Sequence, residues 1–348
     1  MRWHDGAVRA SADVPRVPRL SRRRAGLLLA LASAVAFGGS GATAKPLIEA
    51  GLGPLHVVWI RVAGAALVLL PVAWRHRALA RRRPALLAGF GLLSVAGVQA
   101  FYFAAIERVP VGVAILVEFL GPALLLGWIR FVQRRRVSRA AAVGVALAVA
   151  GMASVVEVWA GLAFDAVGLL LAFCAACCQV SYFLLADHGS EGDDPPDPLA
   201  VIAFGLLAAA VLLTVLARPW AMDWAVLGGS AALGERQVPA LLLACWLVLV
   251  GTVLAYLTGV LAVRRLSPQV AGVVACLEAV LASVFAWVLL GENLGLWQIL
   301  GGSLVLVGAA IAQRAKPGAA PAGPGAAAPG GADAAEEGGS APVPSAPR

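Results

Sequence analysis

Long apolar runs separated by short polar connections make up most of the chain. An α-helix needs about 20 consecutive apolar residues to cross the hydrocarbon core of a bilayer, because each residue adds about 1.5 Å along the helix axis. Ten runs qualify, and proline, glycine or charged residues mark nearly every boundary. They are residues 25–45, 54–73, 85–106, 110–131, 139–158, 165–186, 199–217, 238–262, 268–290 and 294–313. The pattern predicts an all-α integral membrane protein with ten transmembrane helices.

The second half of the sequence repeats the first. Residues 104–151 can be placed without a gap on the residues 157 positions later. This offset pairs Arg108 with Arg265 and Gly144 with Gly301. A repeated apolar unit in a membrane chain is typical of secondary transporters, whose binding sites lie where the two copies meet.

The repeat also sets the predicted domain boundaries. Residues 26–30 recur as residues 168–172 at an offset of 142, so about 15 residues are inserted between the two matching stretches of the second copy. Each copy holds five spans, and an odd number makes the second copy enter the membrane in the opposite sense. We expect a 5+5 inverted repeat, with units at residues 25–158 and 165–313.

Composition supports a membrane location and argues against nucleic acid as a partner. The chain is 61% hydrophobic and 13% charged, whereas soluble domains have about 25% charged residues. The net charge is +8, but the basic residues form short clusters between apolar runs and do not gather on one module. We therefore expect the lipid bilayer, and no nucleic acid, to be the macromolecular surroundings of the chain.

The distribution of basic residues predicts the orientation. With the N-terminus in the cytoplasm, the seven arginines of residues 1–24 and the arginine clusters within residues 75–83 and 130–139 lie inside. The outer connections then hold only three arginines, which are Arg108, Arg218 and Arg236. Cytoplasmic connections normally carry the excess of Lys and Arg. We expect a multi-pass inner (plasma) membrane protein with both termini in the cytoplasm.

The two ends of the chain differ from its apolar body. Residues 1–24 form a basic segment, which we expect to be a cytoplasmic tail ahead of a retained first helix. Residues 314–348 consist mainly of Ala, Gly and Pro. Such a segment buries too little apolar surface to offset its ordering entropy, so a disordered cytoplasmic tail is expected.

Signals for catalysis and for cofactors are missing from the sequence. There is no Gly-x-x-x-x-Gly-Lys-Ser/Thr loop, so transport would be driven by a gradient and not by bound ATP. Cys174 and Cys177 have a zinc-like spacing, but they lie within a span with no second ligand pair nearby, which favours packing. We expect no cofactor, no metal site and no enzymatic activity.

Three charged residues lie within predicted spans, where an ionisable group is energetically unfavourable and needs an explanation. Arg61 and Glu118 lie at similar depths in the second and fourth spans, so they could form an ion pair. Glu278 lies near the middle of the ninth span without an evident cationic partner and could take up a proton. We expect these residues to line a central cavity, with Arg61 holding a substrate carboxylate. The alternative is a buried ion pair that fixes helix register.

Polar uncharged residues at mid-membrane depth extend the candidate site. They are Gln99, Tyr102, Gln179, Tyr182, Thr252 and Tyr256. The 157-residue offset places Gln99 on Tyr256, and Tyr256 is too deep for the interfacial position that tyrosine usually takes. We expect Gln99, Tyr102, Tyr182 and Tyr256 to contribute to the substrate site.

Other charged residues lie at the predicted outer ends of spans. Lys45 and Glu49 end the first span and can extend to water, so an anchoring role is expected. Glu292 lies in an outer turn and is expected to be structural.

Several short motifs resemble the tandem EamA-type repeats of the drug/metabolite transporter superfamily. The first copy has Lys45-Pro46 followed by Trp59-Ile60-Arg61. The second has Leu277-Glu278-Ala279-Val280 and then Gly291-Glu292-Asn293-Leu294, similar to the family's Leu-Glu-Pro-Val and Gly-Glu-x-Leu. Ala279 stands where the family has proline, which leaves a kink of that helix open. The resemblance spans residues 25–313 and implies a carrier of two EamA-like units.

A narrower motif resembles the threonine/homoserine exporter branch. Val117-Glu118-Phe119-Leu120-Gly121-Pro122 is similar to the Glu-Phe-x-Gly-Pro of that branch. The resemblance implies export of small amino acids or related metabolites. The two repeats would act by alternating access about a midplane site, with proton coupling through Glu118 or Glu278 as a hypothesis. A carrier of drugs, nucleotide-sugars or cell-envelope precursors with the same fold is the alternative. An integral-membrane enzyme and a channel are remote alternatives, and a homodimer is compatible with the sequence.

Overall fold

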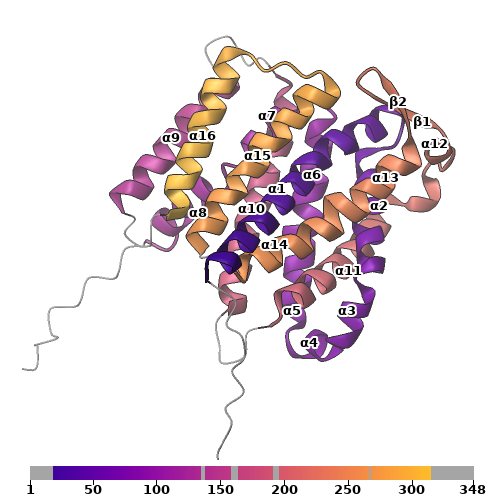
Figure 1. Cartoon of the computed structure of the whole chain (residues 1–348), viewed down its shortest axis with the longest axis horizontal. Coiled ribbons are helices and arrows are strands. Elements are labelled where there is room, and N and C mark those ends of the chain that lie inside the picture. The colour runs from indigo at the N-terminus through magenta and orange to yellow at the C-terminus, as the bar shows by residue number, and fades with distance from the viewer. Residues whose placement is uncertain (1–18, 135–137, 158–163, 191–195, 266–267, 315–348) are drawn as a thin grey trace, which may run out of the picture.

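A computed structural model describes residues 19–134, 138–157, 164–190, 196–265 and 268–314. Most of these residues form helices that lie side by side in one bundle (Figure 1). Residues 1–18 and 315–348, which make up most of the two predicted tails, lie outside the described residues.

The helices follow the order of the predicted spans. The first half contains α1 (Arg19–Glu49), α2 (Pro54–Val68), α3 (Leu70–Arg75), α4 (Arg77–Arg82), α5 (Pro84–Gly89), η1 (Phe90–Gly97), α6 (Val98–Ile106), α7 (Val111–Glu118), α8 (Gly121–Phe131) and α9 (Arg139–Val155). The second half contains α10 (Ala166–Ser190), α11 (Pro198–Ala217), η3 (Pro219–Ala221), α12 (Ala225–Gly228), β1 (Ser230–Leu233), β2 (Arg236–Pro239), α13 (Ala240–Val248), η4 (Leu249–Leu254), α14 (Ala255–Val263), α15 (Pro268–Leu290) and α16 (Leu296–Arg314).

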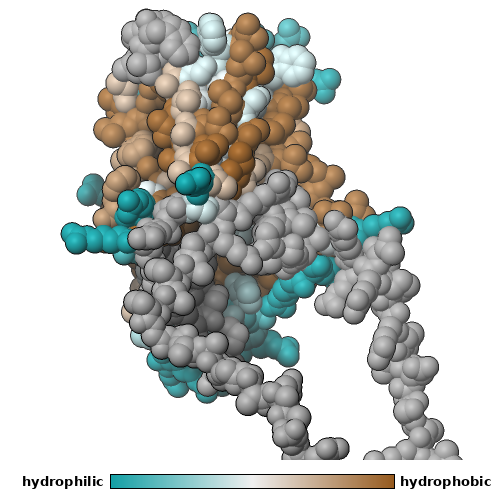
Figure 2. All heavy atoms as spheres, turned by 90° about the vertical axis from the view of Figure 1, so that its left-hand side faces the viewer, coloured by the Kyte–Doolittle hydropathy of each residue, from teal (hydrophilic) through white to brown (hydrophobic). Residues whose placement is uncertain are grey.

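The described helices have the length and composition of membrane spans. Five segments are long and apolar enough to cross a bilayer, namely Arg24–Glu49, Pro84–Ile106, Val111–Phe131, Pro198–Ala217 and Ala240–Ala262. Shorter apolar helices occupy the other predicted spans, at Pro54–Val68, Arg139–Val155, Ala166–Ser181, Cys276–Leu290 and Leu296–Ala312. On the face shown in Figure 2, apolar residues form a broad belt and hydrophilic residues gather mainly below it. The chain is a helical multi-pass membrane protein, and ten crossings remain a prediction.

A small β-hairpin corrects the all-α expectation. Between α11 and α13 the chain forms η3, α12 and the antiparallel pair β1–β2, in which Ser230 lies opposite Pro239. At the hairpin turn Gly234 has a φ of +61°, and a Cβ there would lie 2.8 Å from the Leu289 carbonyl oxygen. The hairpin therefore packs closely against the last turn of α15. We call this end of the bundle, at the top of Figure 1, the hairpin end.

Two π-helical turns occupy matching places in the repeat. η1 spans Phe90–Gly97 and η4 spans Leu249–Leu254. The 157-residue offset places residues 90–97 on 247–254, so the whole of η4 falls within the copy of η1. Single π-helical turns inside α-helices are rare and often lie at functional sites. Their recurrence indicates that both repeats contain the same local π-helical irregularity.

Proline explains one difference between the repeats. Pro122 has no N–H and its ring clashes with the carbonyl four residues earlier, which belongs to Glu118. Accordingly α7 ends at Glu118 and α8 begins at Gly121. The offset places Ala279 on Pro122, and α15 continues without a break through Ala279. At the position where the sequence left a kink open, α15 is therefore not interrupted.

Glycines hold α9 and α16 in very close contact. A Cβ at Gly144 would lie 2.8 Å from the Gly308 carbonyl oxygen, and a Cβ at Gly151 would lie 2.5 Å from that of Gly301. The pairing is crossed, because the offset relates Gly144 to Gly301 and Gly151 to Gly308. The two helices therefore run antiparallel, as two-fold-related helices would. Small residues allow such an approach in lipid, where no hydrophobic force drives helices together.

Candidate functional site

Arg61 is anchored inside the bundle by three acceptors. It lies in α2 and is only 2% exposed. Nε donates to the Thr252 hydroxyl at 2.8 Å, Nη2 to the Gly251 carbonyl at 2.9 Å and Nη1 to Gln99 Oε1 at 2.9 Å. The guanidinium also lies over the Phe103 ring, 5.4 Å from its centroid. Burying a cation is costly unless it is hydrogen-bonded, and each nitrogen of this guanidinium has an acceptor.

Glu118 and Glu278 approach this arginine without bonding to it. Glu118 is 9% exposed at the end of α7, and Glu278 is partly buried in α15. Arg61 interacts electrostatically with both carboxylates, and they interact with each other. Among the described residues, however, neither carboxylate has a hydrogen bond or ion pair. The predicted Arg61–Glu118 ion pair is therefore wrong, because the neutral acceptors on η4 and α6 bind the guanidinium.

The predicted tyrosines lie in the same region as far as they are described. Tyr102, in α6, is 5% exposed, and Tyr256, in α14, packs edge-to-face on Phe37 with the ring centroids 5.0 Å apart. Both tyrosines interact electrostatically with Arg61. Tyr182 lies in α10, but its side chain lies outside the described residues.

A glycine-rich segment of α1 lies at the centre of this region, and sequence reasoning missed it. A Cβ at Gly41 would lie 2.6 Å from the Tyr102 hydroxyl oxygen, and one at Gly38 would lie 3.0 Å from the Glu278 carbonyl oxygen. A Cβ at Gly39 would lie 2.6 Å from the Trp246 ring. The signal was the run Gly38-Gly39-Ser40-Gly41 inside the first span. Its missing side chains allow helices of both repeats to approach α1.

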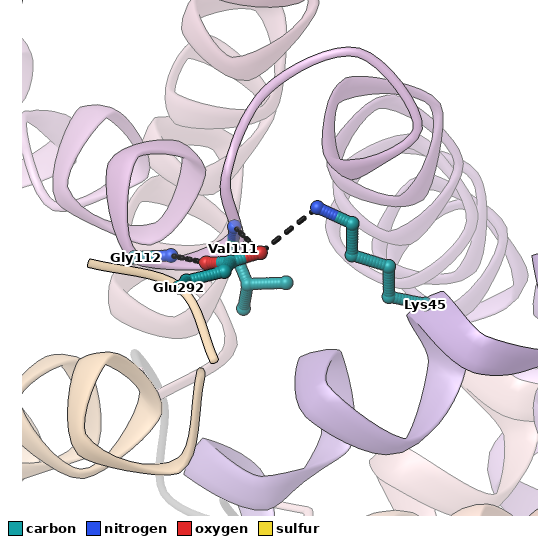
Figure 3. A network of polar contacts seen from close by, with 4 residues as sticks. All are labelled: Lys45, Val111, Gly112 and Glu292. Carbon is teal, nitrogen blue, oxygen red and sulfur yellow. Dashed lines mark hydrogen bonds and ion pairs between the residues drawn. The ribbon is translucent and has the colours of Figure 1, made fainter. Parts of the chain in front are cut away.

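A second polar network joins the repeats at the hairpin end (Figure 3). Glu292, in the connection between α15 and α16, accepts hydrogen bonds from the backbone N–H groups of Val111 and Gly112 at 3.1 and 3.4 Å. Lys45 of α1 donates to the same carboxylate at 2.8 Å. Glu292 thus caps the first turn of α7, where a negative charge is stabilised by unpaired N–H groups. The expected anchoring role of Lys45 is replaced by an ion pair with Glu292.

This network predicts coupled stability effects. The Lys45 and Glu292 side chains are only 19% and 12% exposed, so their interaction is stronger than that of a surface pair. We expect Lys45→Met and Glu292→Gln each to lower the free energy of unfolding, and the double variant to lose less than the sum. The coupling should be about 1–3 kcal/mol. Thermal unfolding of the four proteins in detergent measures it, and strictly additive losses would show that the pair contributes nothing.

Metal binding is one other chemistry to consider in the part of the chain that the structure describes. There, no three His, Cys, Asp or Glu side chains are grouped to hold a metal ion. The described features are a helical bundle in the membrane, two related halves and a polar centre to which both halves contribute. These features are typical of a secondary transporter.

The family follows from comparison with known proteins. The profile of the EamA-like transporter family matches residues 24–156 and again residues 166–313. The chain therefore belongs to the EamA-like transporter family, which makes it a membrane transporter.

Individual relatives narrow the comparison. The chain is 30% identical to the threonine/homoserine exporter RhtA of Escherichia coli strain K12 over 278 residues, which cover 79% of this chain and 85% of the relative. It is also 30% identical to the threonine/homoserine exporter RhtA of Salmonella typhimurium strain LT2 over 265 residues, or 75% and 82% of the two chains. A crystal structure with 20% sequence identity superposes with a TM-score of 0.51 and covers 85% of this chain and 99% of that one, which shows a shared fold.

Proposed function

We propose that this transporter exports small amino acids, with threonine and homoserine as the first candidates, across the inner membrane. The observation that supports the proposal most directly is the pair of carboxylates, Glu118 and Glu278, which have no bonding partner among the described residues. They lie near an arginine that three neutral acceptors hold in place. If both carboxylates are ionised, two negative charges face one positive charge. The centre then attracts one further cation, and the ammonium group of an amino acid supplies it.

The carboxylate of the same substrate would be bound on the arginine side. Arg61 has five N–H groups, and three of them are used in the bonds to Thr252, Gly251 and Gln99. Because Gln99 accepts from Arg61 through its oxygen, its amide nitrogen remains as a donor. The remaining donors of Arg61 and Gln99 would hold the substrate carboxylate, while Tyr102 and Tyr256 contribute hydroxyl groups nearby. A zwitterionic amino acid matches this arrangement, with its ammonium group at the two carboxylates and its own carboxylate at Arg61.

Movement of the substrate would follow from the repeated architecture. In the proposed orientation, with ten spans and both termini in the cytoplasm, the hairpin end faces outward. Two units of five spans related by inversion would alternate between inward-open and outward-open states around the central site. Lys45 and α7 belong to the first unit and Glu292 to the second, so their bonds would have to open for outward release. In this proposal one chain would supply the whole site, so binding would not require the homodimer that the sequence allows.

Proton coupling is the second part of the proposal. A proton and the substrate ammonium would compete for the Glu118–Glu278 pair, because either one balances the excess negative charge. We expect Glu278→Gln to abolish transport driven by a pH gradient, while exchange of labelled for unlabelled substrate continues. Uptake into proteoliposomes with and without a pH gradient measures both activities. An unchanged dependence on the gradient would exclude Glu278 as the coupling site.

Export of a panel of labelled amino acids from bacterial cells that express the chain tests the substrate. We expect threonine or homoserine to leave the cells faster than from cells carrying an empty vector. If no amino acid moves above that control, the amino-acid proposal fails. A carrier of drugs, nucleotide-sugars or cell-envelope precursors with the same fold would then replace it.

A further inference from the structure

The eighth apolar segment changes its hydrogen-bond register where it meets Arg61. At the end of η4, backbone N–H groups bond to the carbonyls of Val250 and Thr252. The carbonyl of Gly251, which lies between them in the sequence, receives neither of these bonds. A carbonyl that the helix leaves unpaired needs another donor when it is buried. Arg61 Nη2 fills this role, with a donor–acceptor distance of 2.9 Å.

The first repeat contains the same register change, but no arginine among the described residues donates to the carbonyl concerned. At the end of η1, backbone N–H groups bond to the carbonyls of Leu93 and Val95, and the Ser94 carbonyl between them receives neither of these bonds. The 157-residue offset places Ser94 on Gly251. The π-helical turn is thus common to both repeats, whereas its use as an acceptor for Arg61 is specific to the second. This asymmetry indicates that η4 has a role beyond helix geometry.

Thr252 presents its hydroxyl oxygen to the arginine in a fixed orientation. The side chain is 1% exposed, and its hydroxyl donates to the Leu247 carbonyl at 2.8 Å. A threonine hydroxyl has one hydrogen, so its oxygen can only accept from Arg61 Nε, at 2.8 Å. Thr252 and Gly251 thus accept hydrogen bonds from two of the three guanidinium nitrogens. Gln99 binds the third nitrogen, and the plane of the group is thereby set.

We propose that Thr252 is a positioning residue that aims Arg61 at the substrate carboxylate. The inference rests on the proposed function and deepens it, because it assigns the preference for a carboxylate-bearing substrate to the π-helical turn of the opposite repeat. Arg61 comes from α2 in the first repeat and its two fixed acceptors from η4 in the second. Recognition of the substrate carboxylate therefore depends on the position of α2 of the first repeat relative to η4 of the second.

The test compares Thr252→Val, which removes the hydroxyl at nearly constant shape, with Thr252→Ser, which keeps it. The probes are labelled threonine and 1-amino-2-propanol, which is threonine without its carboxylate, used as a competitor. We expect Thr252→Val to raise the apparent KM for threonine about 10-fold, as the loss of one buried charge-assisted bond would. Inhibition by 1-amino-2-propanol should stay unchanged, and Thr252→Ser should restore the wild-type KM.

Thr258→Val is the matched control. Thr258 is 7% exposed in α14, and its hydroxyl also bonds back to its own helix, at 2.7 Å from the Leu254 carbonyl oxygen, without a bond to Arg61. We expect this variant to leave both the KM for threonine and the preference over 1-amino-2-propanol as they are.

The outcomes separate the inference from the proposed function. If the wild type transports neither threonine nor any other amino acid of the panel, the proposed function fails. If the wild type transports threonine and Thr252→Val binds both probes as the wild type does, the positioning role is wrong. A Thr252→Val protein that loses affinity for both probes alike, or loses only abundance, would make Thr252 a packing residue and also overturn the inference. A Thr252→Ser protein with the raised KM for threonine of Thr252→Val would also overturn the inference.

Discussion

Replacing Arg61 by alanine should abolish transport and reduce the amount of folded protein in the membrane. The substitution leaves the Gly251 carbonyl, the Thr252 hydroxyl and the Gln99 oxygen without their donor. It also removes a cation that interacts with both Glu118 and Glu278. Removing one charge from a buried set of this kind costs about 3–5 kcal/mol. Export of labelled threonine, normalised to the folded protein recovered by size exclusion in detergent, measures the effect.

Arg61→Lys separates charge from geometry. Lysine keeps the positive charge, but a single ammonium cannot satisfy three acceptors held around a planar group. We expect Arg61→Lys to recover much of the folded protein and little of the transport. Wild-type transport by Arg61→Ala would contradict the central role given to this residue.

Gly151→Ala should strongly destabilise the protein although it adds only one methyl group. The new Cβ would lie 2.5 Å from the Gly301 carbonyl oxygen and 2.7 Å from the Val305 nitrogen. Both are backbone atoms on α16, so no side-chain rotation can relieve the overlap and the helices must separate. Overpacking of this kind costs about 3 kcal/mol. The midpoint of thermal unfolding in detergent should fall clearly.

Gly127→Ala is the matched control for that prediction. Gly127 lies in α8, where a Cβ would have no neighbour within 4 Å. Because alanine favours a helix over glycine by up to about 1 kcal/mol, this variant should be as stable as the wild type or slightly more stable. Equal effects of the two substitutions would show that the α9–α16 contact does not limit stability.

The sequence predicts the apolar segments well, and its internal repeat identifies glycines that the structure places between the two units. Length and hydropathy locate helices because lipid requires each span to satisfy its own backbone. The offset of 157 residues identifies Gly144, Gly151 and their copies, and the structure places these glycines against one another. The charged residues Arg61, Glu118 and Glu278 are also recognisable, since each stands alone in an apolar run.

The bonding partners within the site could not be read from the sequence. Equal depth in the membrane suggested Glu118 as the partner of Arg61. A change of backbone hydrogen-bond register in η4 instead leaves the Gly251 carbonyl to accept from Arg61. No residue type in the sequence predicts such a change. Lys45 and Glu292 are 247 positions apart and sit in separate motifs, so only the folded chain brings them together. The β-hairpin was detectable only as an insertion of about 15 residues, from the difference between the offsets of 142 and 157.

Export by the wild type beside Glu118→Gln tests the central claim most directly. Glutamine keeps the shape of the side chain and removes the negative charge that would receive the substrate ammonium. Glu107→Gln is the matched control, because Glu107 is exposed in the connection between α6 and α7. The account predicts that cells with the wild type or Glu107→Gln export labelled threonine or homoserine, and that Glu118→Gln at equal membrane abundance falls to the empty-vector rate. Export by Glu118→Gln at the wild-type rate would contradict it.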